Sequence, residues 1–228
     1  MSMKLNVIIT GTTGMVGEGV LHECLQHPDI ASVLVINRKT CGILHPKLTE
    51  IIHHNFFDIS AITPQLRGFN ACYFCVGVSS IGMREEIYKH LTYDLTMYLA
   101  GVLSAENPDM TFCYVSGAGT DNTGKSGRMW ARVKGQTEND LMQLPFKAVY
   151  NFRPAYIQPM KGSSNTHKFY YAFAWLYPLW QLLFRNYVCT LRELGDAMIL
   201  VSQNGYQSHI LESKDIIKVI KNNFSAIG

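Results

Sequence analysis

A short apolar run that leads into three evenly spaced glycines is the feature that most constrains how this chain folds. Residues 5–10 (LNVIIT) are apolar and largely β-branched, which is typical of a buried strand. Gly11, Gly14 and Gly17 follow directly, and apolar residues then recur at helical spacing. The pattern predicts a strand, a tight turn and a helix that begins inside the glycine motif.

The three glycines suit a loop that holds a phosphate group. Gly11 tolerates the positive φ of a tight turn, Gly14 lets the backbone approach a ligand, and Gly17 lets the helix pack closely on the strand. The helix N-terminus then presents backbone N–H groups to the anion, so we predict that the loop binds the pyrophosphate of a dinucleotide. Because the spacing departs from GxGxxG, a glycine-rich turn without a ligand is the alternative. The cofactor-binding residues predicted here are Gly11, Thr13, Gly14, Met15, Val16 and Gly17.

The end of the second predicted strand, residues 31–36, indicates which dinucleotide binds. In a dinucleotide fold an acidic residue at this position accepts hydrogen bonds from the ribose 2′-hydroxyl of NAD, whereas an arginine accommodates the 2′-phosphate of NADP. This chain has Arg38 and Lys39 there, and no acidic residue near them. NADP(H) is therefore the preferred cofactor, and NAD(H) is the second choice. Solvated loop cations are the other interpretation of these two residues.

Length and charge disfavour several other classes of protein. The 228 residues fit one domain with a substantial core, and a net charge of +3 without a basic cluster does not favour nucleic-acid or membrane binding. The first predicted strand leaves no room for a signal peptide, and no apolar run is long and clean enough to span a bilayer. We therefore expect a cytoplasmic protein.

The cysteines and the paired histidines do not predict a disulfide framework or a metal site. Six cysteines in a chain of this size, three of them in apolar runs, indicate buried and reduced thiols. Cys72 and Cys75 are three positions apart, and His53 and His54 are adjacent. Within a strand the members of each pair would face opposite sides, so we expect no metal.

Strands and helices alternate along the rest of the chain. We predict strands at residues 50–56, 71–78, 110–115 and 146–152, and helices at 83–105 and 128–144. This alternation predicts an α/β fold with a doubly wound parallel sheet, whose ligands bind at the carboxyl ends of the strands. Ser116 lies at that edge, and Trp130 and Lys134 lie one turn apart on the helix that follows.

Several short motifs follow the predicted strands in a fixed order. They are GTTGMVG at residues 11–17, Arg38, Asp58-Ile59, Val76-Gly77, Ser116, Lys134 and Arg153-Pro154-Ala155-Tyr156-Ile157. In combination they resemble the atypical or extended short-chain dehydrogenases/reductases, an NAD(P)-binding family with epimerase/dehydratase-like members. The resemblance is strongest to the branch of the Tat-interacting tumour-suppressor protein, and it covers about residues 4–160.

This resemblance implies a Rossmann-type fold and an NADP-dependent oxidoreductase. The enzyme would move a hydride to or from a carbonyl or hydroxyl of a small, hydrophobic substrate. Ser116 and Lys134 would be catalytic, Trp130 and Tyr156 would bind the substrate, and a homodimer would be the family's usual assembly. The further cofactor contacts implied are Asp58, Ile59, Val76, Gly77, Lys134 and Pro154.

Trp130 occupies the position of the family's YxxxK tyrosine. That tyrosine exchanges a proton with the substrate oxygen, whereas an indole N–H only donates a hydrogen bond near neutral pH. Two functions therefore stay open. One is an oxidoreductase whose proton comes from another group or a water, and the other is a catalytically weak or inactive NADPH-binding regulator or scaffold.

The C-terminal third is expected to complete a single Rossmann-type domain of residues 1–228, in which residues 160–228 contribute a small helical cap. Closing helices are predicted at 190–201 and 214–220, with an extended piece at 209–211. The aromatic stretch 167–184 is interrupted and too short to cross a bilayer. It suits the wall of a hydrophobic pocket or a partner surface, and it suits a membrane surface less, because its polar face has no row of basic residues.

Overall fold

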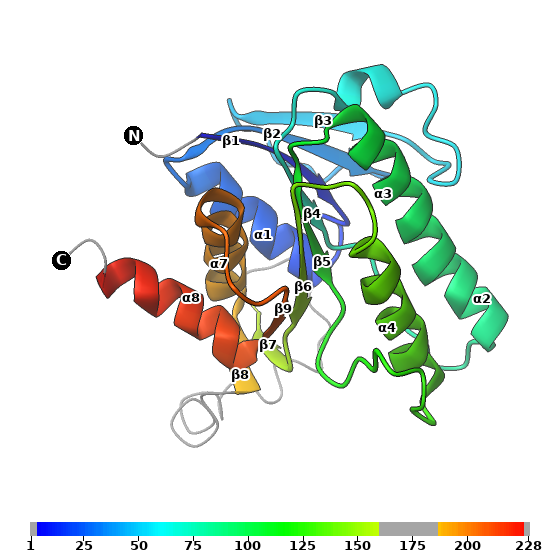
Figure 1. Ribbon diagram of the computed structural model, residues 1–228. Helices are drawn as coiled ribbons and strands as arrows, with labels where there is room; N and C mark the ends of the chain where they lie inside the picture. The colour runs from blue at the N-terminus through cyan, green and yellow to red at the C-terminus, as the bar shows by residue number, and fades with distance from the viewer. Residues whose placement is uncertain (1–3, 160–186, 226–228) are drawn as a thin grey trace.

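The computed structural model describes residues 4–159 and 187–225, and it contains a parallel sheet with helices on both faces (Figure 1). The sheet has seven strands in the order β3-β2-β1-β4-β5-β6-β9, and the order reverses between β1 and β4. The strands are β1 (Leu5–Thr10), β2 (Ile30–Asn37), β3 (Leu48–Ile52), β4 (Ala71–Phe74), β5 (Thr111–Val115), β6 (Ala148–Arg153) and β9 (Ile210–Glu212). This arrangement confirms the predicted doubly wound α/β fold.

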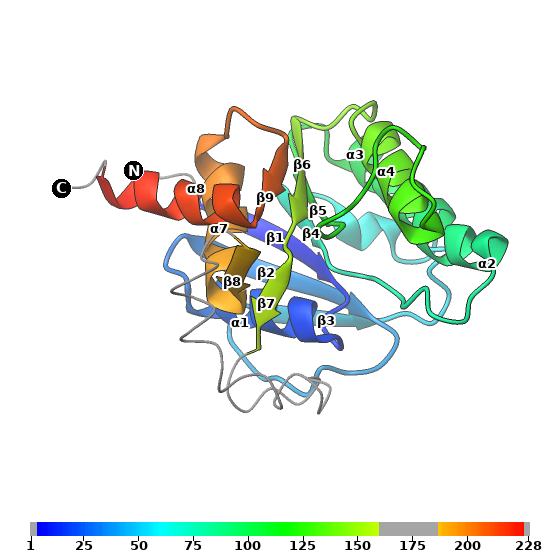
Figure 2. The ribbon, with the colours of Figure 1, turned by 90° about the horizontal axis from the view of Figure 1, so that it is seen from below.

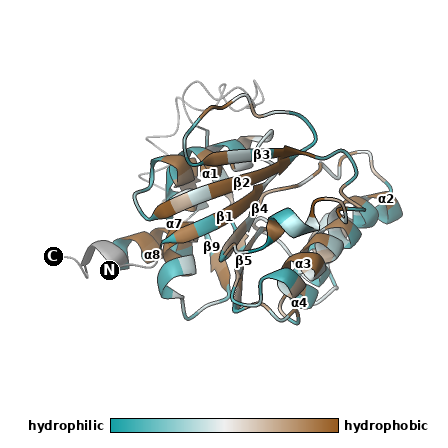
Figure 3. Cartoon of the chain, turned by 90° about the horizontal axis from the view of Figure 1, so that it is seen from above, coloured by the Kyte–Doolittle hydropathy of each residue, from teal (hydrophilic) through white to brown (hydrophobic). Residues whose placement is uncertain are grey.

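The helices form two layers, one on each face of the sheet (Figure 2). They are α1 (Met15–Gln26), α2 (Glu85–Lys89), α3 (Leu95–Glu106), α4 (Met129–Leu141), α7 (Leu191–Asn204) and α8 (Ser213–Ser225). In β1, Val7 and Ile9 belong to the apolar cluster shared with α1 and α7, whereas Ile8 belongs to the cluster shared with α3. Because both faces are covered, the inner strands are apolar along most of their length, as Figure 3 shows.

The third predicted strand is wrong at its carboxyl end. β3 ends at Ile52 and not at residue 56. Asn55 starts a turn, because its side-chain Oδ1 accepts the N–H of Phe57 at 3.1 Å and its carbonyl oxygen accepts the N–H of Asp58 at 3.1 Å. Phe56 is nevertheless buried, so its hydrophobicity reflects packing beneath a loop and not membership of the strand.

The fourth predicted strand also ends early, and the long helix has an internal irregularity. β4 ends at Phe74 and not at residue 78, and a last hydrogen bond of 3.3 Å joins Cys75 N–H to the carbonyl of Thr10. The helix predicted at 83–105 consists of α2, a π-helical turn (η2, His90–Asp94) and α3 in direct succession. Such π turns occur often at functional sites.

In the described part of the predicted C-terminal cap, β9 and α7 belong to the main layers of the fold, whereas β8 belongs to a separate two-stranded sheet. Residues 160–186, which include the aromatic stretch 167–184, lie outside the described residues. β8 (Val188–Thr190) pairs with β7 (Tyr156–Gln158), and α7 packs on α1 where Leu191 lies against Gly19. Within residues 4–159 and 187–225, no helix is both long and apolar enough to cross a membrane.

Gly135 on α4 provides a test of how the loop after β5 packs. A Cβ at Gly135 would lie 1.8 Å from the carbonyl oxygen of Asp121, whereas a Cβ at Gly101 on α3 would meet no atom within 4 Å. We expect Gly135→Ala to lower the free energy of unfolding by about 1–3 kcal/mol, because backbone must move. The control Gly101→Ala should raise it by about 0.5–1 kcal/mol, because alanine favours a helix. Urea denaturation of both variants measures the difference, and equal effects would contradict this packing.

Candidate functional site

A pocket opens where the strand order reverses, at the carboxyl ends of β1, β2 and β4. Its volume is about 340 Å³, which falls in the range of small-molecule sites. Open α/β sheets bind ligands at such a switch point. The predicted cofactor residues that line this pocket are Gly11, Thr13, Gly14, Arg38, Val76 and Gly77.

The glycine loop allows an unusually close approach of backbone to backbone. Gly11 has a φ of +77°, and a Cβ there would lie 2.6 Å from the carbonyl oxygen of Cys75. A Cβ on Gly17 would lie 2.2 Å from the carbonyl oxygen of Gly11. The N-cap of α1 is Gly14, which has no side chain that could cap the helix, and this suits an N-terminus that presents its N–H groups to an anion.

A cation and flat apolar groups form the outer part of the pocket. Arg38 is exposed and lines the rim, whereas Lys39 is exposed but is not among the lining residues. Phe57 lines the pocket and stacks on His90, with ring centroids 4.3 Å apart and ring planes 4° apart. The pocket therefore combines an anion-binding helix end, a guanidinium and an aromatic wall.

Other predicted cofactor residues lie outside the lining of this pocket. Asp58 is exposed, and its carboxylate accepts the hydroxyl of Ser60 at 2.6 Å; this hydrogen bond and one from the Ser60 N–H hold the pKa of Asp58 below its usual range. Ile59 is buried, and its N–H donates to the hydroxyl of Tyr98 at 3.1 Å. Met15 and Val16 pack against the core on the first turn of α1. Their contacts with a cofactor stay predictions.

Lys134 and Ser116 meet at the carboxyl end of β5, as their positions in the sequence predict. The Nζ of Lys134 donates to the carbonyl oxygen of Ser116 at 2.5 Å. Burial lowers the pKa of Lys134 to about 8, although the carboxylate of Glu138 favours the charged form. Lys134 is thus an amine that exchanges its proton only slightly above neutral pH.

The hydroxyl of Ser116 is directed toward α4. It donates to Oε1 of Glu138 at 2.5 Å and contacts the carbonyl oxygen of Phe152 at 3.2 Å. Ser116 is buried, and it is absent from the residues that line the pocket beside β1. In this arrangement the hydroxyl holds a carboxylate in place, and its contact with a substrate stays a prediction.

A buried ion pair completes this polar cluster. Glu138 on α4 is fully buried and pairs with the guanidinium of Arg153 at the end of β6, with an Nε–Oε1 distance of 2.9 Å. Asn122 donates from Nδ2 to Oε2 of Glu138 at 2.9 Å and also accepts a hydrogen bond from Arg153. The pair therefore ties together β5, the loop after it, α4 and β6.

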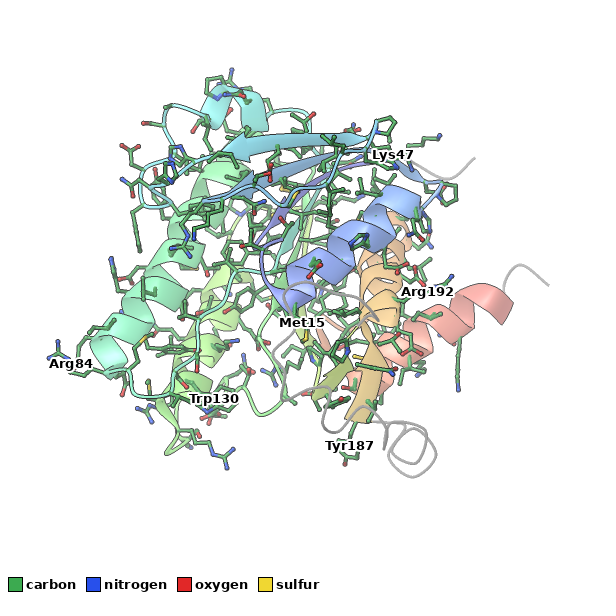
Figure 4. The ribbon with its side chains drawn as sticks, turned by 180° about the vertical axis from the view of Figure 1, so that it is seen from behind. Met15, Lys47, Arg84, Trp130, Tyr187 and Arg192 are labelled. Atoms are coloured by element: carbon green, nitrogen blue, oxygen red, sulfur yellow. The ribbon has the colours of Figure 1, made fainter. Side chains whose placement is uncertain are left out.

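Trp130 lies at the start of α4, in contact with the loop after β5 (Figure 4). Gly119 has a φ of +86°, and a Cβ there would lie 3.3 Å from the Cη2 atom of the indole. The carbonyl oxygen of Pro154 accepts the N–H of Ala118 at 3.0 Å, and Tyr156 begins β7 two residues later. These residues surround one loop, and neither Trp130 nor Tyr156 is among the residues that line the pocket at β1 and β4.

Sequence reasoning missed two acidic residues. Glu138 lies four positions after Lys134, and its helical spacing was the available signal. Glu50 on β3 accepts a hydrogen bond from Asn37 Nδ2 at 3.0 Å. An acidic residue at the end of β2 therefore comes from the adjacent parallel strand, although none lies near Arg38 and Lys39 in the sequence.

The lowered pKa of Lys134 predicts a pH dependence of stability. Between about pH 8 and about pH 10.5 the unfolded chain holds a proton that folded Lys134 has lost, so stability rises with pH across that window. We expect the free energy of unfolding of the wild type, relative to Lys134→Met, to increase by about 1–2 kcal/mol from pH 7.5 to pH 10. Denaturant titrations across this range measure it. Lys125→Met, at an exposed lysine, is the control, and its free energy of unfolding should change with pH as that of the wild type does. If Lys125→Met lost the pH dependence as Lys134→Met does, the effect would belong to another group.

Curated proteins of modest similarity exist, although no family model matches the chain. The chain is 28% identical over 167 residues to "Protein fmp52-1, mitochondrial" of Aspergillus oryzae, which covers 70% of this chain and 69% of that protein. It is 24% identical over 167 residues to "Protein FMP52, mitochondrial" of Saccharomyces cerevisiae, with 72% and 69% covered.

These names contradict the expected cytoplasmic location. The relatives are called mitochondrial, at 24–28% identity over about 70% of this chain. The expectation rested on the early first strand and on the length of the apolar runs, and neither feature bears on import into mitochondria. The prediction of a cytoplasmic protein is therefore wrong on the available comparison.

Solved structures resemble the chain over nearly its whole length. WbmG of Bordetella bronchiseptica in complex with NAD has a TM-score of 0.67 and 13% identity, covering 99% of this chain and 79% of that one. A short chain dehydrogenase of Burkholderia cenocepacia in complex with NADP has a TM-score of 0.65 and 11% identity, covering 100% and 97%. A UDP-N-acetylglucosamine 4-epimerase of Methanobrevibacter ruminantium has a TM-score of 0.67 and 14% identity, covering 92% and 76%. The chain therefore has the fold of the short-chain dehydrogenases/reductases and epimerases, as the order of its motifs predicts.

Proposed function

We propose that this chain binds NADP(H) in the pocket between β1 and β4 and acts as an oxidoreductase of the atypical short-chain type. The substrate is a small, hydrophobic carbonyl or hydroxyl compound. The proposal rests above all on one convergence: the close-packed glycine turn, the open N-terminus of α1 and Arg38 all meet at the same pocket. Two proteins of the same fold hold NAD and NADP in their structures, which supports a nicotinamide cofactor.

The residues of the pocket fit the adenosine and pyrophosphate half of the cofactor. Gly11 and Gly14 have no side chains and both line the pocket, so a pyrophosphate can approach their backbone at the N-terminus of α1. Arg38 at the rim supplies a charge-assisted partner for a 2′-phosphate. The wall around Phe57 offers a flat apolar surface to the adenine ring. When bound, the nicotinamide supplies or accepts the hydride.

The reacting half has an altered set of proton donors. Trp130 donates at most a hydrogen bond, and the hydroxyl of Ser116 is already bound to Glu138. Lys134, whose pKa is about 8, is the group beside this loop that exchanges a proton near neutral pH. We assign Lys134 to the substrate oxygen, directly or through a water, and Trp130 and Tyr156 to the substrate-binding surface.

The same two observations favour a second function. Without the tyrosine hydroxyl and with Ser116 directed toward Glu138, the chain fits a catalytically weak or inactive NADPH-binding regulator or scaffold. A homodimer, expected from the resemblance, is compatible with either function. The two functions differ in whether bound NADPH is oxidised.

Calorimetric titration with NADPH, NADH and NADP tests the cofactor. We expect micromolar binding of NADPH, and we expect Arg38→Ala to weaken it by about 10–100-fold, because it removes a charge-assisted phosphate contact of roughly 1.5–3 kcal/mol. Binding of NADH should change little, since NADH has no 2′-phosphate. Lys125→Ala, which removes an exposed cation outside the pocket lining, is the matched control. Absence of binding by every dinucleotide would refute both functions.

Substitution of Trp130 separates the two functions. If the site is otherwise intact, Trp130→Tyr restores a group that exchanges a proton, and it should raise the rate of NADPH oxidation with a panel of hydrophobic carbonyl compounds by about 100-fold or more. Trp130→Phe introduces the same ring as tyrosine without the hydroxyl, so it controls for the smaller side chain. NADPH oxidation that stays at zero in both variants, while NADPH still binds, would favour the regulator.

A further inference from the structure

Glu50 holds the turn that follows β2 through both of its carboxylate oxygens. Oε2 accepts the hydroxyl of Thr40 at 2.6 Å, and Oε1 accepts the backbone N–H of Cys41 at 2.8 Å. Oε1 also accepts Nδ2 of Asn37 at 3.0 Å. Glu50 lies on β3, so the adjacent strand anchors both ends of the segment that contains Arg38 and Lys39.

A second, buried contact connects this segment to the glycine loop. The hydroxyl of Thr12 lies 2.7 Å from Nδ2 and 3.0 Å from Oδ1 of Asn37. Thr12 is 1% exposed and Asn37 is 2% exposed, so little water competes for these hydrogen bonds. Asn37 thus joins the pyrophosphate turn on one side to Glu50 on the other.

The arrangement leaves Arg38 available to a ligand. Arg38 forms no ion pair within 4.0 Å with any of the described residues, and it lines the pocket rim. Glu50 is the acidic residue of the neighbouring strand, but its oxygens already accept three hydrogen bonds from the turn and from Asn37. Although burial opposes ionisation, these hydrogen bonds lower the pKa of Glu50, so the carboxylate is charged at neutral pH and is engaged with the turn.

We propose that Glu50 is a positioning residue for cofactor selection: it fixes the Thr40–Cys41 turn so that Arg38 faces the 2′-phosphate of NADP(H). This inference rests on the proposed function, because it concerns how the same pocket distinguishes its two candidate cofactors. NADPH and NADH share the pyrophosphate that the glycine loop binds, and only NADPH has the 2′-phosphate. Loss of the Glu50 contacts should therefore lower the affinity for NADPH relative to the affinity for NADH.

The opposite role for Glu50 makes an opposite prediction. A free carboxylate near the adenosine ribose would accept a hydrogen bond from the 2′-hydroxyl of NADH and repel a phosphate. Its removal would then strengthen NADPH relative to NADH. A carboxylate that positions Arg38 gives the reverse, so the sign of the change separates the two roles.

Calorimetric titration of NADPH and NADH into the wild type, Glu50→Ala, Arg38→Ala and the double variant tests the inference. We expect Glu50→Ala to lower the NADPH/NADH affinity ratio by about tenfold, with NADH affinity within about twofold of wild type. The double variant should show no lower ratio than Arg38→Ala alone, because Glu50 acts through Arg38. Glu50→Gln keeps an acceptor for Cys41 and Asn37, so it should retain most of the ratio. Glu85→Ala is the matched control, because it also removes a carboxylate, one that pairs with Arg132 outside this pocket.

Thr40→Val provides a milder variant should Glu50→Ala fail to fold. It removes one hydrogen bond to Glu50 at an exposed residue and should lower the affinity ratio about threefold. A ratio that stays unchanged or rises in Glu50→Ala or Thr40→Val overturns the inference, and so does additivity of the Glu50 and Arg38 effects, while the cofactor proposal stands. A wild type that binds neither dinucleotide refutes the proposed function itself.

Discussion

The backbone contact between Gly17 and Gly11 sets the geometry on which the pocket depends. A Cβ at Gly17 would lie 2.2 Å from the carbonyl oxygen of Gly11, so the first turn of α1 rests directly on the turn after β1. A Cβ at Gly11 would meet the carbonyl of Cys75 at 2.6 Å, so the same turn also lies against the chain that leaves β4. A side chain at either position would clash with this backbone and would move the N-terminus of α1 away from the point where the strand order reverses.

The buried pair of Glu138 and Arg153 constrains the other end of the site. A buried carboxylate is costly unless charged and hydrogen-bonded partners surround it, and this one has Arg153, Asn122 and Ser116. Lys134 lies one turn before Glu138 on α4, so the ion pair also fixes where the Lys134 amine meets the carbonyl of Ser116. The position of the reacting end thus depends on a charge pair between α4 and β6, and Ser116 serves as one of its supports.

Features set by neighbouring residues could be predicted from the sequence, whereas features set by distant residues could not. β1 and the glycine turn follow from a local apolar run and from the steric freedom of Gly11, and the structure has both at the predicted positions. The predicted strands extend past the true ends of β3 and β4 because Phe56 and Val76 are apolar without belonging to the sheet. Both residues line the pocket, and Phe56 is buried beneath a loop. The hydrogen bond of Ser116 to Glu138, and those of Asn37 and Cys41 to Glu50 beside Arg38, were missed. They were missed because α4 and β3 meet these residues only in the fold.

The contrast between the two halves of the site bears on how the protein works. In the proposed function, the glycine turn and Arg38 meet at the cofactor half of the site, whereas the reacting half has Trp130 where the short-chain dehydrogenases/reductases that the chain resembles have a tyrosine. A Cβ at Gly119 would lie 3.3 Å from the indole of Trp130, so the loop after β5 packs closely against this ring. Under the proposed oxidoreductase function, proton transfer is assigned to Lys134, whose pKa burial lowers to about 8, and turnover would depend on how closely a substrate oxygen approaches that amine. Under the proposed function, cofactor binding and turnover would therefore be separable, because the first is assigned to the glycine turn and Arg38 and the second to Lys134.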